Sequence, residues 1–295
     1  MKRAGFILAL VVATGGVARA AASEAEGAPR ATRKNKPAAK GASSAAPSMP
    51  AARLETLRLA LVGADDAAAV EAAGALGESG TPSAAEPLCE VLAAGAAPDR
   101  LQAVLDALGK LGAAHALPAD QTVLEALTLY SGHRAIDVRR RAVKALGAVN
   151  DPRATPPLLE RLGDAVPEVR AAAAEALAAR HESKASRRMF ALLAMGDAGV
   201  AGPLATLATP DMIPRIAELT GTIDDAVIAD ALGDYVKRAD VPDKLRVDVL
   251  RTLGNLSGAV ATTALVEYIA SVPAKEDRAS KKEAQKLLDQ RGTSQ

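Results

Sequence analysis

The sequence has 295 residues and a net charge of +1; 49% of the residues are hydrophobic, yet only 2% are aromatic and none is tryptophan. Alanine and leucine, both strong helix formers, supply most of the apolar content, whereas β-rich folds draw on valine, isoleucine, threonine and aromatic residues. The composition therefore argues against a β-rich fold and predicts an all-α chain. The single cysteine, Cys89, excludes an internal disulfide framework.

The first twenty residues have the three parts of a secretory signal peptide. A short basic start (residues 1–3) precedes an apolar core (residues 6–12) too short to span a bilayer, and residues 18–20, Ala-Arg-Ala, form a small-residue cleavage site. No cysteine follows the core and no arginine pair precedes it, which argues against a lipoprotein anchor and a twin-arginine signal. We expect cleavage after Ala20, no membrane-spanning segment afterwards, and a periplasmic or secreted mature protein.

Residues 21–52 consist mainly of alanine, serine, proline, glycine and lysine. Such a segment buries too little apolar surface to offset the entropy of ordering, so we expect a disordered linker. Two roles stay open for it: a plain spacer, or a weak electrostatic tether to anionic lipid or cell-wall polymer. The tether would consist of five basic residues, Arg30, Arg33, Lys34, Lys36 and Lys40.

Beyond the linker, residues 53–292 form the expected folded domain. Acidic residues outnumber basic ones there. Because nucleic-acid binding usually requires a basic patch or stripe, we expect no nucleic-acid partner.

The tripeptide Ala-Leu-Gly, or a close variant, recurs along this domain. Its leucines lie at positions 76, 108, 146, 177, 232 and 253, and the first three intervals are 32, 38 and 31 residues. A period in the low thirties fits two helices of three to four turns with two short turns. The longer interval contains residues 130–133, Tyr-Ser-Gly-His, which we interpret as a loop extension.

Within each repeat the apolar spacing is helical. Five apolar residues fall at positions that form one stripe along a helix: Leu101, Val104, Leu105, Leu108 and Leu111. Residues 150–152 should end one helix, and residues 155–157 should begin the next with proline in its first turn.

Five further helices are predicted toward the end of the chain. Two short buried helices are expected within residues 191–210, followed by helices over 224–237 and 243–255. A charged helix around residues 280–288 should cap the stack and keep its open end soluble.

Residues 137–162, beginning Asp-Val-Arg-Arg-Arg-Ala-Val-Lys-Ala-Leu-Gly, and residues 167–177 resemble bacterial HEAT repeats. The resemblance is strong over 134–180, fair over 66–112 and degenerate after residue 181. It implies an all-α fold, a right-handed superhelix of stacked antiparallel helix pairs with a concave and a convex face. Some HEAT-like families attach bilin chromophores or act as DNA glycosylases, but the sequence supports neither activity.

No set of residues suggests a catalytic or metal site. His115, His133 and His181 are far apart and belong to no metal-ligand motif, and no G-x-S-x-G motif occurs. Cys89 lies on an apolar helical stripe without a nearby basic residue, which indicates a buried, unreactive thiol. We expect neither an enzyme nor a cofactor.

Basic residues cluster in the two best-matched repeats: Arg139, Arg140, Arg141, Lys144 and Arg170. Two interpretations are open. The resemblance implies arginine pairs with acidic residues of a neighbouring repeat, for which Asp137 and Glu168 are candidates. Alternatively, these residues form a basic strip on the inner face that binds acidic groups of a protein partner.

Among the few aromatic residues, Tyr130 is our first choice for a contact with a partner, because interfaces favour tyrosine and arginine. Tyr235 and Tyr268 lie on helical stripes and should belong to the core. A second basic group should be a solvated helix face: Arg180, Lys184, Arg187 and Arg188.

The sequence thus predicts an exported, non-enzymatic scaffold that binds an envelope protein through its solenoid. The alternative is a structural envelope component held to the wall or lipid by the linker.

Overall fold

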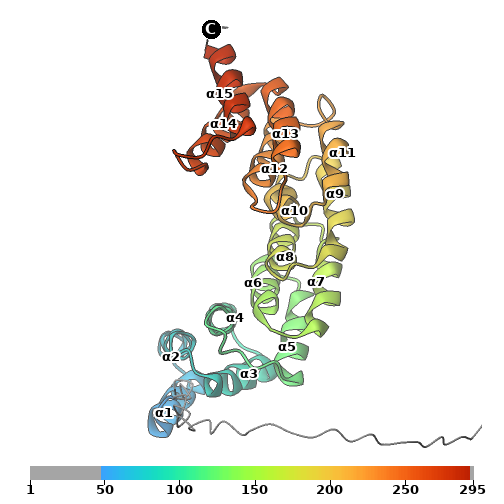
Figure 1. Ribbon diagram of the computed structural model, residues 1–295. Helices are drawn as coiled ribbons and strands as arrows, with labels where there is room; N and C mark the ends of the chain where they lie inside the picture. Colours follow the sequence, from blue (N-terminus) through green and yellow to red (C-terminus); the bar gives the residue numbers. More distant parts are fainter. Residues whose placement is uncertain (1–47, 293–295) are drawn as a thin grey trace, which may run out of the picture. The chain divides into compact units, whose positions relative to one another are not determined.

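The computed structural model describes residues 48–292, and these residues form one compact unit (Figure 1). The predicted signal peptide and nearly all of the predicted linker, including its five basic residues, lie outside the described residues. Helix α1 begins at Ala51, inside the predicted linker, so the folded unit starts slightly earlier than the sequence indicated.

The described residues contain fifteen α-helices and no strand, which confirms the all-α prediction. Helices α1 to α8 are Ala51–Val62, Asp66–Glu78, Ala85–Ala94, Pro98–Ala113, Gln121–Ser131, Ile136–Ala148, Thr155–Arg161 and Pro167–Ala179. Helices α9 to α15 are Ser186–Ala194, Ala201–Leu207, Ile213–Ala217, Asp225–Lys237, Asp243–Asn255, Gly258–Ser271 and Ala279–Gly292.

The helices stack in two layers. The even-numbered helices pack on one another in order from α2 to α14, and α1, α3, α5 and α7 pack likewise in the other layer. Helices α4, α6, α8, α10 and α12 line the concave side of the unit, and α5, α7, α9 and α11 lie on its convex side (Figure 1). The unit is thus an α-solenoid of antiparallel helix pairs.

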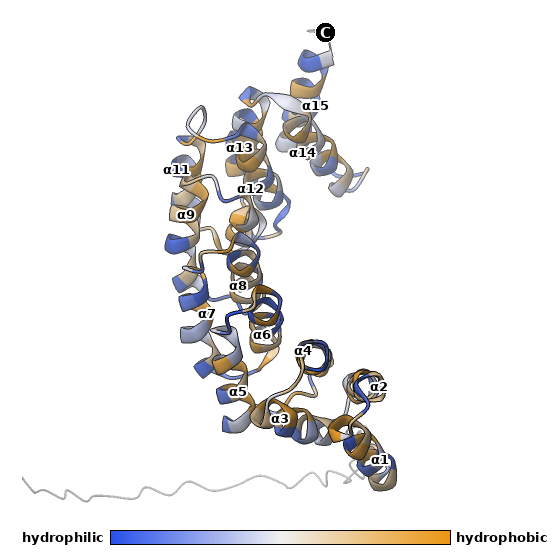
Figure 2. Cartoon of the chain, turned by 180° about the vertical axis from the view of Figure 1, so that it is seen from behind, coloured by the Kyte–Doolittle hydropathy of each residue, from blue (hydrophilic) through white to orange (hydrophobic). Residues whose placement is uncertain are grey.

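The core lies between the layers and continues along the stack. Hydrophobic and hydrophilic residues alternate within the helices (Figure 2), as amphipathic packing requires. The predicted stripe from Leu101 to Leu111 is fully buried, and so are Tyr235 and Tyr268. Because one helix pair cannot bury its own apolar stripe, each pair depends on its neighbours.

The Ala-Leu-Gly repeat has a packing function that the structure makes clear. Gly77 faces Ala107, Gly147 faces Ala176 and Gly233 faces Ala264. A Cβ atom added to these glycines would lie 2.7, 2.5 and 2.9 Å, respectively, from the nearest atom of the facing alanine. In each case the alanine belongs to the next helix of the even-numbered layer. Glycine at these positions therefore allows neighbouring helices of this layer to approach closely.

Two predictions about local structure need correction. The extra residues of the 38-residue interval lie in the connection at 114–120, whereas Tyr130 and Ser131 are the last residues of α5. Within residues 191–210, α10 is the only complete α-helix, and the start of this segment belongs to α9. Helices α12 and α13 match their predicted ranges closely.

The terminal helix α15 packs on α13 and α14. A buried polar network fixes it: the hydroxyl groups of Tyr268 and Ser280 are hydrogen-bonded at 2.5 Å, and the Ser280 hydroxyl donates to Asp243. The outward side of α15 is charged, as a capping helix requires. Within residues 48–292, no helix combines the length and the apolar character needed to cross a bilayer.

Candidate functional site

Helix α6 carries the predicted basic strip on the concave side of the unit. Its apolar residues Val138, Ala142, Val143 and Leu146 are buried in the core. Apart from the exposed Ile136, the remaining positions of its N-terminal two turns are basic or acidic, so the helix presents its charges away from the core. The five predicted basic residues divide into two groups with different environments.

Arg139 is a structural residue. Its guanidinium donates two hydrogen bonds to the Asp164 carboxylate at 2.9 and 3.0 Å, and two more to the carbonyls of His133 and Arg134. The Asp164 side chain is only 6% exposed. Burial alone would raise the pKa of Asp164, but hydrogen bonds from Arg139 and the Val166 backbone hold that pKa below its usual value.

Arg170 repeats this arrangement one unit further on. It donates to Asp197 at 2.6 Å and to the carbonyls of Asp164 and Ala165. The Asp197 side chain is 7% exposed. The predicted pairing with acids of a neighbouring repeat thus occurs for both arginines, but with Asp164 and Asp197 rather than with Asp137 and Glu168, because the guanidinium groups reach the loop of the following unit.

Arg140, Arg141 and Lys144 form the second group, which we call the α6 basic face. Arg140 pairs with Asp137 and Arg141 with Asp106, whose side chains are 61% and 52% exposed. Lys144 is exposed and has no ion-pair or hydrogen-bond partner among the described residues. Exposed ion pairs contribute little to stability because water screens them, so these cations can exchange partners.

Tyr130 is more enclosed than predicted. Its side chain is half-buried against the core, and its hydroxyl donates to the Leu92 carbonyl at 2.7 Å. The ring lies 6.0 Å from that of His133. This hydrogen bond links α5 to α3, which gives Tyr130 a structural role whether or not a partner also contacts it.

The predicted solvated face from Arg180 to Arg188 is only partly solvated. Arg180 donates to the carbonyls of Gly147, Val149 and Asp151, where α6 ends. Arg238 and Arg291 bind the ends of α10 and α13 in the same way. Each satisfies carbonyls that a helix C-terminus leaves unpaired. The sequence signal for these three residues is their position. Each is an arginine at or near the end of one helix, and that helix packs on the helix whose C-terminus the arginine caps.

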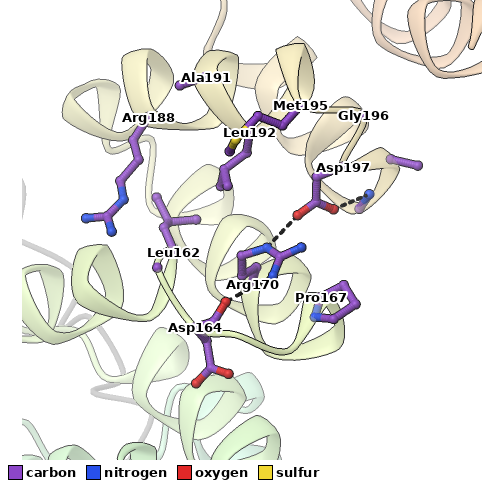
Figure 3. Close-up of a pocket in the computed structure, with 13 residues that line it drawn as sticks. Leu162, Asp164, Pro167, Arg170, Arg188, Ala191, Leu192, Met195, Gly196 and Asp197 are labelled. Atoms are coloured by element: carbon purple, nitrogen blue, oxygen red, sulfur yellow. Dashed lines mark hydrogen bonds and ion pairs between the residues drawn. The ribbon is translucent and has the colours of Figure 1, made fainter. Parts of the chain in front are cut away.

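Arg188 differs from Arg180 because it faces a hollow. The hollow, about 830 Å³, lies between the α7–α8 loop and α9. Leu162, Ala191, Leu192 and Met195 supply its apolar wall, with Arg188 at one side and the Arg170–Asp197 pair at the other (Figure 3). We call it the α7–α9 hollow; the sequence alone gave no sign of it, because its walls come from separate repeats.

The remaining groups with potential reactivity are one cysteine and three histidines. Cys89 is buried, and burial together with the nearby charge of Asp120 raises its thiol pKa to about 12. His115, His133 and His181 lie in loops or directly after helices, and His133 accepts a hydrogen bond from the Ala135 backbone. In the described part of the chain, no three histidine, cysteine or acidic side chains gather as metal ligands would.

Two family models match segments of the chain. Residues 122–202 match HEAT repeats, and residues 68–94 match the PBS lyase HEAT-like repeat. These segments contain α5 to α9 with the start of α10, and α2 with α3. With the two-layer fold, the matches support a HEAT-repeat protein. No curated protein matches the sequence.

Several solved structures are similar to the chain. The complex of CpcE and CpcF of phycocyanin lyase from Nostoc sp. PCC7120 contains a chain with 19% identity and a TM-score of 0.45; the match covers 88% of this chain and 99% of that chain. Kap121p shares 16% identity with a TM-score of 0.49, over 80% of this chain and 29% of Kap121p. A designed armadillo repeat protein in complex with the peptide (KR)4 shares 17% identity, with a TM-score of 0.35, over 80% and 98%.

Proposed function

We propose that this protein is an exported, non-enzymatic interaction scaffold that binds an acidic surface of an envelope protein through the α6 basic face. The observation that carries the proposal is the contrast within one helix. Arg139 is committed to a buried carboxylate, whereas Arg140 and Arg141 pair only with exposed acids and Lys144 pairs with none. The α6 basic face therefore offers three cations to an acidic partner.

The chemistry of the described side chains favours binding over catalysis. Arg139 stabilises the ionised form of Asp164 and holds its pKa below the usual value, so this carboxylate is not poised to transfer protons near neutral pH. The Cys89 thiol is protonated at neutral pH because its pKa is raised to about 12. Electrostatic complementarity across a rigid solenoid surface supplies partner selection without a reactive group.

Export is supported by the sequence of residues 1–20 alone. The protein purified from its host should begin at Ala21 and should fractionate with the envelope or the medium. N-terminal sequencing and cell fractionation test this part of the proposal. Recovery of an uncleaved chain from the cytoplasm would contradict it.

The binding proposal is tested by paired charge reversals. Arg140→Glu with Lys144→Glu should reduce the protein that co-purifies after crosslinking in the host envelope by at least about tenfold, because like charges across an interface repel. The matched control is Lys244→Glu with Lys286→Glu, which makes the same charge change at exposed sites on α13 and α15. Unchanged recovery with the first pair, or an equal loss with the control, would overturn the proposal.

A further inference from the structure

We propose a second binding site, separate from the α6 basic face: the α7–α9 hollow binds an extended peptide segment in which a carboxylate side chain lies next to an apolar side chain. The site combines an apolar wall, a single unpaired guanidinium and an open entrance. Its residues come from α8, from α9 and from the loops that follow α7 and α9.

The size and lining of the hollow suit a few peptide residues. Its volume of about 830 Å³ lies within the usual range of ligand pockets. Met195 at the rim is 74% exposed and is the most exposed large hydrophobic side chain of the described residues. A flexible, polarisable methionine adapts to differently shaped apolar partners, which makes an exposed position at a pocket rim a favourable contact.

The charge of the hollow selects for an anion. Both acidic residues of the lining are neutralised, Asp164 by Arg139 and Asp197 by Arg170. Arg188 is exposed and has no ion-pair or hydrogen-bond partner among the described residues. One guanidinium in this setting matches one carboxylate, which it can bind with two parallel hydrogen bonds.

A polyanion is a poorer occupant than a single carboxylate. Nucleic acids gain affinity from several cations that neutralise successive phosphates. Here two carboxylates, Asp164 and Asp197, lie close to Arg188, the one cation of the lining without a partner among the described residues. A segment with one acidic side chain pairs with Arg188 and places its apolar neighbour on Leu192 and Met195.

Gly163 gives Arg188 its position. A Cβ atom at residue 163 would lie 2.3 Å from a terminal nitrogen of the Arg188 guanidinium. The guanidinium therefore rests on the backbone of the α7–α8 loop, beside the apolar wall. Alanine at position 163 would displace the end of this flexible side chain without obstructing the main body of the fold.

Methionine-methyl NMR on the full chain tests the site directly. The chain has five methionines, and the Met195 signal is assigned by its loss in Met195→Leu. The probes are the peptides acetyl-Gly-Leu-Glu-Leu-Gly-amide and its glutamine counterpart. The glutamate peptide should shift the Met195 signal saturably with a Kd of about 1 mM or tighter, and should leave Met49 and Met212 unchanged. The glutamine peptide should bind at least about tenfold more weakly.

Two variants and one control separate the site from a general surface effect. Arg188→Gln should remove the preference for glutamate over glutamine, and Gly163→Ala should weaken it. Arg187→Gln, on the same helix but outside the hollow, should change nothing. The proposal is overturned if the glutamate peptide leaves Met195 unshifted at about 10 mM, if the two peptides bind equally, or if Arg187→Gln and Arg188→Gln act alike. None of these outcomes depends on the α6 basic face.

Discussion

Two neighbouring arginines on α6 have opposite roles although they look alike in sequence. Arg139 makes four hydrogen bonds to a carboxylate and two carbonyls in the loops, whereas Arg140 makes one bond to an exposed aspartate. The difference arises from the helical rotation between consecutive residues, which directs one side chain toward the adjacent loops and the other toward water. Position along a helix thus decides whether an arginine stabilises the fold or remains available for binding.

Arg139→Ala should lower the free energy of unfolding by about 2–4 kcal/mol, because it leaves the nearly buried Asp164 carboxylate without its charged partner. Arg140→Ala should change it by less than about 0.5 kcal/mol. Denaturant titration of both variants measures the difference. Similar losses for the two variants would show that the Arg139 pair is not structural.

The Arg139–Asp164 pair also predicts a pH dependence. The pKa of Asp164 is lowered in the folded state, so the pair stabilises the fold above the pKa that this carboxyl has when unfolded. That stability is lost as the pH falls through the lower, folded pKa. The loss of stability between neutral and acidic pH should therefore be smaller in an Arg139→Gln variant than in the unmodified protein. Acid titrations of the two proteins measure this difference in stability loss. An identical pH dependence would contradict this account.

Cys89 should be unreactive while the protein is folded. Its raised pKa of about 12 keeps the thiol protonated at pH 8, and burial keeps reagents away. Reaction with a disulfide reagent at pH 8 should proceed only as fast as the protein opens, and denaturant should accelerate it strongly. Rapid labelling of the native protein would contradict the buried position.

At the scale of helices, close approach in the even-numbered layer depends on glycine. Gly147→Ala should destabilise the protein by about 1–3 kcal/mol, because the new methyl group would lie 2.5 Å from the Ala176 Cβ atom. Gly109 belongs to the same tripeptide motif, but a Cβ atom there meets no other atom within 4 Å. Gly109→Ala should therefore stabilise its helix by up to about 1 kcal/mol, and thermal unfolding distinguishes the two variants.

The helices themselves could be predicted well from the sequence. Helices α12 and α13 were predicted nearly to the residue. The apolar stripe of α4 and the proline-marked start of α7 were also located correctly, because each signal lies within a single helix. The position of the longer connection was wrong, since residues 130–133 contain turn-forming residues although α5 continues through Ser131. Tertiary packing against α3, through the Tyr130–Leu92 hydrogen bond, outweighs that local preference.

At the scale of the whole molecule, the candidate sites were harder to predict than the fold. The basic cluster on α6 was visible in sequence, but its division into buried and available cations depends on loops of the next unit. The lining of the α7–α9 hollow comes from two separate stretches of the chain, residues 162–170 and 188–199. A repeat pattern specifies how units stack, whereas binding surfaces form where individual units depart from that pattern.

At the same scale, the proposed function requires that the α6 basic face binds a protein partner in the envelope. The most direct measurement places the photo-crosslinking amino acid benzoylphenylalanine at position 144 in the native host, with the same substitution at exposed position 244 as the control. We predict one discrete protein adduct from position 144, attached through an acidic segment of the partner, and none from position 244. Absence of any adduct from position 144, or the same adducts from both positions, would contradict the claim.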